Sequence, residues 1–534
     1  MGLRAILWLA YELVSGVDNS PAHFTCSSFV PPDLSPKIDA SYLAFAIEQS
    51  SAVHYAVERD GVTPNDYSIN LFRAITNTTG GDLHIRLGGT SNDYAHYSPG
   101  QLVPALPIAE QNQSQVVTVA NLSLGPSYWT TMAKIPDAKY VIQIPLVQTN
   151  DSEAVAWAES SYAVLSDRIQ SIEIGNEPNS YPNGHDGPGF LPPMNSTYYA
   201  QVFADRVDLI TKSLNLDGKI FQAMDLGEPP TEWLNAPDSF AAGIDRAGMI
   251  NQAAFHLYQT TSGSADTLHS GLMNHTAITS LLDRYVPSIQ HINKDQHLPF
   301  MFSEVGNSLN VTQNYAYQAV LGSALWQMDW ELAAAVRGVH RVYYQQIMHA
   351  GYNLWLPLDS SGREAQTYSN FYGRMAIGDF LGATGGQTRI APVHVASSAE
   401  LAHISAYGAW VENELVRLAI VNFDYWDSRG SPYNPQHPDS LCTTCPKSHK
   451  HRPVFTIVLD GLPSQSTILV KHLTADSGAH ADGSEVTFGG MQWPAATRGL
   501  PVQVKRDDKE VRVHKGRAEI RVHASSAVVV HLGL

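Results

Sequence analysis

The sequence predicts an α/β fold, a (β/α)8 TIM barrel followed by a C-terminal all-β sandwich domain. Two observations lead to this prediction. Short apolar segments alternate with helical segments between residues 38 and 385, which is typical of repeated βα units. After the glycine-rich stretch 382–386 the apolar period changes to two, which is typical of antiparallel sheet. The length of 534 residues also favours one large and one smaller domain.

Eight apolar segments are the predicted barrel strands. Each is nearly continuous in Val, Ile, Leu, Phe or Ala, as expected for parallel strands that are covered on both faces. They span residues 42–47, 83–88, 140–146, 169–175, 219–226, 250–258, 299–304 and 351–356. Segments 198–214 and 316–336 have apolar residues at helical spacing, so we expect them to be crossover helices.

We expect three regions along the chain. Residues 1–37 form a leader and an extended segment that adds a strand to the β domain, residues 38–385 form the catalytic barrel, and residues 386–534 form the β-sandwich. Within the last region, strands are predicted at 454–459, 466–472, 502–505, 511–514 and 518–532, separated by Gly, Asp and Pro turns.

The charge and motif content exclude several classes of function. The formal net charge of −17 opposes binding to nucleic acid and to anionic membranes. The sequence has no glycine-rich phosphate loop, so nothing demands a nucleotide or another cofactor. No segment reaches the roughly 18 apolar residues that a membrane span requires. A metal site is not expected among the catalytic residues.

Secretion is predicted from the glycosylation motifs, although the N-terminal leader is atypical. The apolar stretch 5–14 is interrupted by Glu12. Seven Asn-x-Ser/Thr motifs occur, at Asn77, Asn112, Asn121, Asn150, Asn195, Asn274 and Asn310. For Cys442 and Cys445 we favour a local disulfide over a zinc site completed by neighbouring histidines, which leaves Cys26 unpaired.

Two glutamates follow predicted strands on opposite sides of the barrel. Strand four ends in EIGNEP, which places Glu177 at the carboxyl rim, and strand seven ends in FSEVGN, which places Glu304 at the same rim. Glycoside hydrolysis uses such a pair, one carboxyl group to protonate the leaving oxygen and another to attack or to activate water. We expect Glu177 to be the acid/base and Glu304 the nucleophile, close enough for a retaining mechanism.

These motifs resemble those of clan A glycosidases, and in particular of glycoside hydrolase family 79. The resemblance spans most of the chain and includes LAFAIEQ, RLGGTSND, EIGNEPN, FHLYQ, FSEVGNS and ALWQMDW, in that order. It implies a TIM barrel with a trailing β domain and an activity among the β-glucuronidases, 4-O-methyl-glucuronidases and heparanases. The implied partner is a carbohydrate, a β-glucuronide.

The resemblance also assigns residues around the two glutamates. It implies that Arg86 hydrogen-bonds the nucleophile and keeps it ionised, and that Asn176 contacts the sugar 2-hydroxyl. Tyr258, at the end of strand six, is expected to orient Glu304, whereas ordinary packing is the alternative for it and for His256.

Three further positions are predicted to contact the sugar. Glu48 ends strand one and is expected to bind sugar hydroxyls, with helix capping as the alternative. Gly351 and Tyr352 resemble the family position at which a backbone amide and a phenol recognise the substrate carboxylate. Structural roles are expected for the remaining candidates, Asp225, Asp329, Glu331, His340 and Arg341.

The favoured interpretation is a retaining exo-β-glucuronidase acting on terminal glucuronic or 4-O-methyl-glucuronic acid. A heparanase-like endo-glucuronidase fits less well, because a polysulfated chain favours a basic protein and this one is acidic. Another clan A β-glycosidase would carry the same glutamate pair. A non-catalytic glycan-binding protein is the alternative from a different class.

Overall fold

The fold is that of a computed structural model of the whole chain. It describes residues 21–26, 30–93, 95–106, 122–146, 150–181, 194–227, 229–260, 267–309, 315–348, 351–360, 362–393, 403–429 and 451–533. Residues 1–20, which include the atypical leader, and the pair Cys442 and Cys445 lie outside these ranges.

Eight parallel strands close into a barrel. Around the barrel their order is β10-β11-β12-β2-β3-β7-β8-β9, so each strand pairs with its neighbours in the chain and the last closes on the first. The strands are β2 (Leu43–Glu48), β3 (His84–Gly88), β7 (Lys139–Ile144), β8 (Ile169–Ile174), β9 (Phe221–Leu226), β10 (Ile250–Thr260), β11 (Phe300–Ser308) and β12 (Arg341–Gln346). The predicted TIM barrel is therefore confirmed.

The eighth predicted strand was wrong. The strand that closes the barrel is β12, whereas 351–356 forms a turn and then the short strand β13 (Trp355–Leu356), which pairs with β14 (Gln366–Thr367). The segment of β12 ends in two glutamines and therefore looks less apolar than Leu354-Trp355-Leu356, yet all six of its residues are buried. The Gln346 side chain is satisfied by nearby backbone, because it donates to the Gln345 carbonyl at 2.8 Å and accepts from the Leu354 amide at 3.1 Å.

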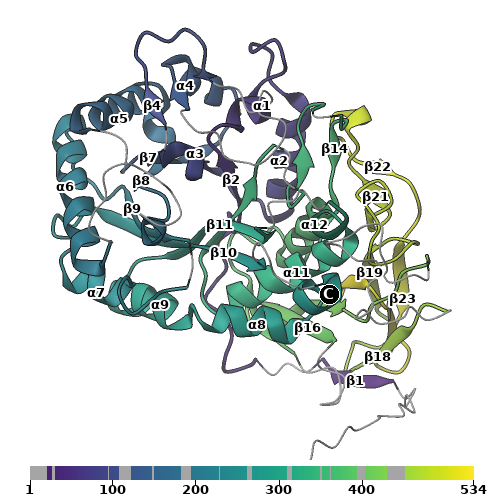
Figure 1. Cartoon of the computed structure of the whole chain (residues 1–534). Helices are drawn as coiled ribbons and strands as arrows, with labels where there is room; N and C mark the ends of the chain where they lie inside the picture. The colour runs from purple at the N-terminus through teal and green to yellow at the C-terminus, as the bar shows by residue number, and fades with distance from the viewer. Residues whose placement is uncertain are drawn as a thin grey trace, which may run out of the picture.

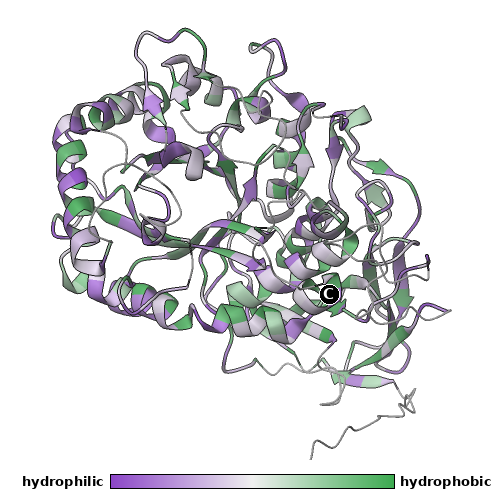
Figure 2. Cartoon of the chain, viewed as in Figure 1, coloured by the Kyte–Doolittle hydropathy of each residue, from purple (hydrophilic) through white to green (hydrophobic). Residues whose placement is uncertain are grey.

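Helices cover the outside of the barrel (Figure 1). Hydrophobic and hydrophilic residues alternate along these helices, most visibly on the side of α5 and α6 (Figure 2). The helices are α1 (Ala52–Ala56), α2 (Asp66–Thr79), α3 (Thr90–Asp93), α4 (Ser127–Met132), α5 (Asp151–Leu165), α6 (Ser196–Leu214), α7 (Ala236–Ala241), α8 (His275–Asp283), α9 (Val286–Gln290), α10 (Tyr315–Gln318), α11 (Leu321–Val336) and α12 (Ser369–Leu381). Helix α11 is buried almost throughout, including Trp326 and Trp330, because it lies between the barrel and the C-terminal sheet.

The C-terminal region is rich in sheet, as predicted. A nine-stranded sheet contains β15 (Arg389–Pro392), β16 (Ile404–Val411), β17 (Glu414–Asn422), β25 (Ser526–His531), β19 (Thr467–Thr474), β20 (Thr487–Phe488), β21 (Met491–Gln492), β22 (Val502–Gln503) and β23 (Asp508–Arg512). Strands β16 and β17 were not predicted from the sequence, and the predicted strand 518–532 is two strands joined by a turn.

The extended N-terminal segment adds a strand to this region. Strand β1 (Ala22–Thr25) pairs in parallel with β18 (Val454–Asp460), and β18 pairs with β24 (Arg517–His523). Cys26 follows β1 directly and is partly buried. The N-terminal segment is thus attached to the β region before the chain enters the barrel.

One hydrophobic core joins the barrel to the nine-stranded sheet. It runs from the barrel strands through α11 and α12 to residues of β16, β17 and β25, while the other face of the sheet packs against β18 and β24 in a second core. In the parts of the chain that the structure describes, no helix combines the length and hydrophobicity that crossing a bilayer requires.

Candidate active site

Glu177 lies in a strained turn directly after β8. Its backbone adopts a left-handed conformation with φ of 49°, which is unusual for a residue with a side chain and is found at functional sites. The turn is held by a hydrogen bond from the Glu177 amide to the carbonyl of Asp225, at 3.0 Å. A Cβ atom on Gly227 would lie 2.4 Å from the carboxyl carbon of Glu177. The position of this carboxyl group therefore depends on a glycine in the next loop.

Glu304 lies within β11, where the pairing of that strand is irregular. The register shifts between Phe302 and Val305 against β12, and the register against β10 shifts next to Glu304. Such irregularities redirect side chains near active sites. Both carboxylate oxygens of Glu304 accept hydrogen bonds, Oε1 from the Tyr258 hydroxyl at 2.7 Å and Oε2 from Arg86 at 2.7 Å.

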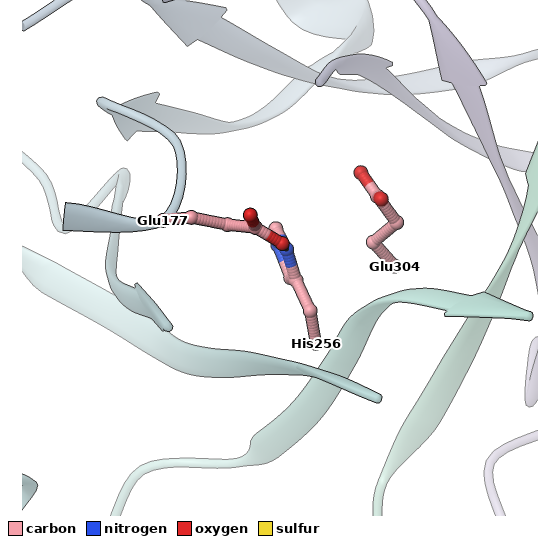
Figure 3. Close-up of side chains that lie close together, drawn as sticks. All are labelled: Glu177, His256 and Glu304. Atoms are coloured by element: carbon pink, nitrogen blue, oxygen red, sulfur yellow. The ribbon is translucent and has the colours of Figure 1, made fainter. Parts of the chain in front are cut away.

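The two carboxylates approach each other across the barrel mouth (Figure 3). Glu177, Glu304 and His256 each place one polar atom within 4.8 Å of the others. Retaining glycosidases have carboxyl groups about 5–5.5 Å apart, whereas inverting enzymes leave about 6.5–9.5 Å for a water molecule. The separation is closer to that of a retaining pair than to that of an inverting pair.

Arg86 connects Glu304 to the strand that precedes Glu177. It donates two hydrogen bonds to Glu173, at 2.8 and 2.6 Å, and one of 2.8 Å to the side-chain oxygen of Asn176. Burial opposes the charge of Arg86, but the carboxylates of Glu173 and Glu304 hold its pKa well above its usual range. A permanent cation therefore lies beside Glu304.

His256 contacts Glu177. Its Nδ1 atom lies 2.9 Å from Glu177 Oε1, and its Nε2 atom lies 3.8 Å from Asp225. Burial lowers the pKa of His256, but hydrogen bonds to Asp225 and Glu177 outweigh it and raise the pKa to about 10. His256 is therefore an imidazolium at neutral pH, and its ring lies next to the Glu177 carboxylate in Figure 3.

The structure places Glu48 and Tyr352 at the same rim. Glu48 is buried at the end of β2 and accepts hydrogen bonds from the backbone amides of Ser50 and Ser91, at 2.8 and 2.9 Å. Burial raises the pKa of Glu48 to about 7, against these hydrogen bonds. The Tyr352 ring packs on Tyr258, with 5.8 Å between centroids.

A side chain at position 351 would not point toward the two glutamates. It lies in the turn after the true eighth strand, and a Cβ atom there would meet Gln318 at 2.7 Å and not the catalytic carboxylates. Tyr352 follows the same strand, so both residues still lie on the carboxyl side of the barrel. Their predicted role in binding a carboxylate stays a prediction.

Three residues of the site were not assigned from the sequence. Glu173 pairs with Arg86, His256 contacts Glu177, and Asp225 accepts hydrogen bonds from Gln222 and Ser303 beside His256. A structural role was expected for Asp225, but it lies beside Glu177 and His256. A charged residue in the apolar strand IQSIEI was the available signal for Glu173.

The other residues expected to be structural are found in ion pairs or hydrogen bonds away from the glutamate pair. Asp329 contacts His275 and Tyr407, Glu331 pairs with Arg374, and Arg341 and His340 both pair with Asp39.

Among the described residues, Glu177, His256 and Glu304 are best placed to hold a metal ion, because one donor atom of each lies close to the others. However, each Glu304 oxygen already accepts a hydrogen bond and His256 is cationic, so the arrangement suits proton transfer and nucleophilic attack better than metal binding.

A (β/α)8 barrel with paired glutamates on strands four and seven, one held by Arg and Tyr, defines a glycoside hydrolase. Residues 406–529 match the model described as the glycosyl hydrolase family 79 C-terminal beta domain. Together with the full-length relatives below, this match supports glycoside hydrolase family 79.

Two curated relatives align along nearly the whole chain. A β-glucuronidase of Aspergillus niger is 23% identical over 95% of this chain and 93% of its own length. A β-glucuronidase of Neurospora crassa is also 23% identical, over 92% of this chain and 90% of its own length.

Solved structures show the same fold. A 4-O-α-L-rhamnosyl-β-D-glucuronidase of Fusarium oxysporum superposes with a TM-score of 0.75 at 19% identity, over 95% of this chain and all of the other. A family 51 arabinofuranosidase of Xanthomonas axonopodis has a TM-score of 0.61 at 12% identity, over 93% of this chain and 97% of the other.

Proposed function

We propose that the protein is a retaining exo-β-glucuronidase that releases terminal β-linked glucuronic acid or 4-O-methyl-glucuronic acid. The observation that carries the proposal is the approach of Glu177 and Glu304 to within 4.8 Å in a barrel that is followed by a region matching the family 79 C-terminal beta domain. Curated relatives that align along the whole chain are β-glucuronidases, which supports the choice of sugar.

The first step uses the two carboxyl groups together. Glu304, which accepts hydrogen bonds from Arg86 and Tyr258, attacks the anomeric carbon. Glu177 donates its proton to the leaving oxygen, so the glycosidic bond breaks as the glycosyl ester forms. In the second step Glu177 removes a proton from water, which attacks the same carbon and frees Glu304 with the β configuration retained.

Asn176 is positioned to assist. Its side-chain oxygen accepts a hydrogen bond from Arg86, and its Nδ2 atom is buried without a hydrogen-bond partner among the described residues. An amide held in this way can donate to a sugar hydroxyl, and a bond to the 2-hydroxyl strengthens in the transition state. This contact would contribute to kcat more than to binding.

We propose that the side of the site that carries Tyr352 recognises the substrate carboxylate. The phenol is buried beside Tyr258, and burial together with the charge of Glu304 keeps the Tyr352 pKa high, so the hydroxyl remains a donor. A neutral donor can bind a uronate carboxylate next to an anionic nucleophile without neutralising the charge of that nucleophile.

A panel of aryl β-glycosides tests the proposed specificity. We expect the β-glucuronide to be cleaved with a kcat/KM at least about 100-fold above the β-glucoside and β-xyloside, which lack the C6 carboxylate. Cleavage of a neutral glycoside at a similar rate would favour another clan A activity. Cleavage of a sulfated polymer without release of terminal uronate would favour an endo-glucuronidase, and binding without turnover would favour a glycan-binding protein.

A further inference from the structure

An open cavity lies beside one of the glycosylation motifs. Its volume is about 420 Å³, within the range of about 300–1,000 Å³ typical of small-molecule sites. Asn195, Ser196 and Thr197, the three residues of the motif, line it together with Trp233 and Asp238. All three motif residues thus face a space large enough for a sugar.

Trp233 provides an apolar surface in this cavity. It is 45% exposed, whereas most of the described tryptophans are fully or almost fully buried. An exposed indole ring offers a flat apolar face to the C–H face of a pyranose, and covering that face removes apolar area from water. The exposure of Trp233 is therefore explained if a sugar ring covers it.

The backbone fixes Trp233 relative to the motif. The Ser196 amide donates to the Trp233 carbonyl at 2.9 Å, and the Asn235 amide donates to the Ser196 hydroxyl at 3.1 Å. Ser196 is the middle residue of the motif and is buried. The loop that carries the indole ring and the start of α6 that carries the asparagine therefore form one unit.

The side-chain nitrogen of Asn195 is available for modification. Its oxygen accepts a hydrogen bond from the Tyr198 amide at 2.9 Å, which caps α6, and among the described residues its Nδ2 atom has no partner. Both Asn195 and Thr197 are exposed. Asn274, by contrast, is only partly exposed and donates its Nδ2 to the Ser270 carbonyl at 3.3 Å.

We infer that Asn195 carries an N-linked glycan whose first sugar packs on Trp233. The modification joins Asn195 Nδ2 to the anomeric carbon of an N-acetylhexosamine, which leaves a lipid-linked donor and releases its diphosphate carrier. The oxygen of Asn195 continues to cap α6, so the helix start is compatible with the modified residue. The inference goes beyond the hydrolytic activity and does not depend on it.

Glycopeptide mapping tests the modification. The full chain is secreted from a yeast host behind a supplied secretion signal, and the glycans are released enzymatically in ¹⁸O water, which labels each modified asparagine as aspartate. We expect Asn195 to be labelled in most molecules of the wild type and of Thr197→Ser, which keeps the motif. Thr197→Ala should abolish the label. Folded, secreted wild type with unlabelled Asn195 would overturn the inference.

Thermal unfolding tests the packing on Trp233. Thr197→Ala removes the glycan but keeps the Asn195 cap, and we expect it to lower the Tm of the secreted protein by about 1–2 °C. In a Trp233→Ala background the same substitution should change Tm by less than half as much. An equal Tm change in both backgrounds would overturn the packing. Removal of the separate motif with Ser152→Ala is the control, and its effect should not depend on Trp233.

Discussion

The Nδ1 atom of His256 lies 2.9 Å from Oε1 of Glu177, and the histidine has a pKa of about 10. Glu177 is therefore in contact with a cation at neutral pH. Asp225 and Glu304 are the other anionic groups that face the ring, and Arg86 is the other cation. A cation in contact lowers the pKa of a carboxyl group by about 1–3 units.

Replacing the histidine should move the alkaline limb of the pH–rate profile. In His256→Asn the carboxyl group of Glu177 loses its cationic neighbour, so we expect it to hold its proton to higher pH. The alkaline limb of kcat/KM should shift upward by at least about one unit for a poor leaving group, which needs acid assistance. An unchanged limb, or a downward shift, would show that His256 does not control this proton.

Removing the tyrosine hydroxyl beside the nucleophile should lower kcat. In Tyr258→Phe, Glu304 loses a hydrogen bond of 2.7 Å. A hydrogen bond to a charged group contributes about 1.5–3 kcal/mol, so kcat should fall roughly 10- to 150-fold. Steady-state kinetics and Tm would be measured together. An unaltered kcat at an unaltered Tm would remove Tyr258 from the positioning of Glu304.

A methyl group added at Gly227, next to the carboxyl group of Glu177, should impair acid catalysis. The added Cβ in Gly227→Ala would lie 2.4 Å from the carboxyl carbon of Glu177 and would displace it. A shift of about 1 Å costs about 100-fold in rate, so we expect that loss with an alkyl glucuronide and a much smaller loss with a nitrophenyl glucuronide. Gly218→Ala, with nothing within 4 Å of the added atom, is the matched control. Equal losses on both substrates would contradict the assignment of Glu177.

Stability should fall as pH rises from 4.5 to 7 because of Glu48. Burial raises its pKa from 4.5 to about 7, so in this range the folded state binds more protons than the unfolded state. The contribution is about 3 kcal/mol. Urea unfolding at several pH values would measure the slope. Glu48→Gln should flatten it, and an unchanged slope in this variant would mean that Glu48 is ionised in the fold.

The parts of the fold that were predictable depend on local patterns. Seven barrel strands are largely apolar, Glu177 comes just after one of them and Glu304 lies in the C-terminal half of another, so the strand order alone placed them at one rim. Strand β12 was missed because it ends in Gln345 and Gln346, whose polarity hides a strand that is buried along its whole length.

The network around the glutamates was less predictable. Arg86 and Glu173 are 87 positions apart, and their pairing depends on barrel closure, which no local pattern encodes. His256 and Tyr258 are two residues apart on β10, yet they contact different glutamates. The register shift between Phe255 and His256 alters the regular alternation there, and a single sequence does not reveal it.

The configuration of the first product tests the central claim most directly. Proton NMR of a β-glucuronide digest, recorded before mutarotation, distinguishes the anomers of the released sugar. Because Glu177 and Glu304 approach within 4.8 Å, the β anomer should form first, through a glycosyl ester on Glu304. Initial release of the α anomer would contradict the double-displacement mechanism and the roles assigned to both residues.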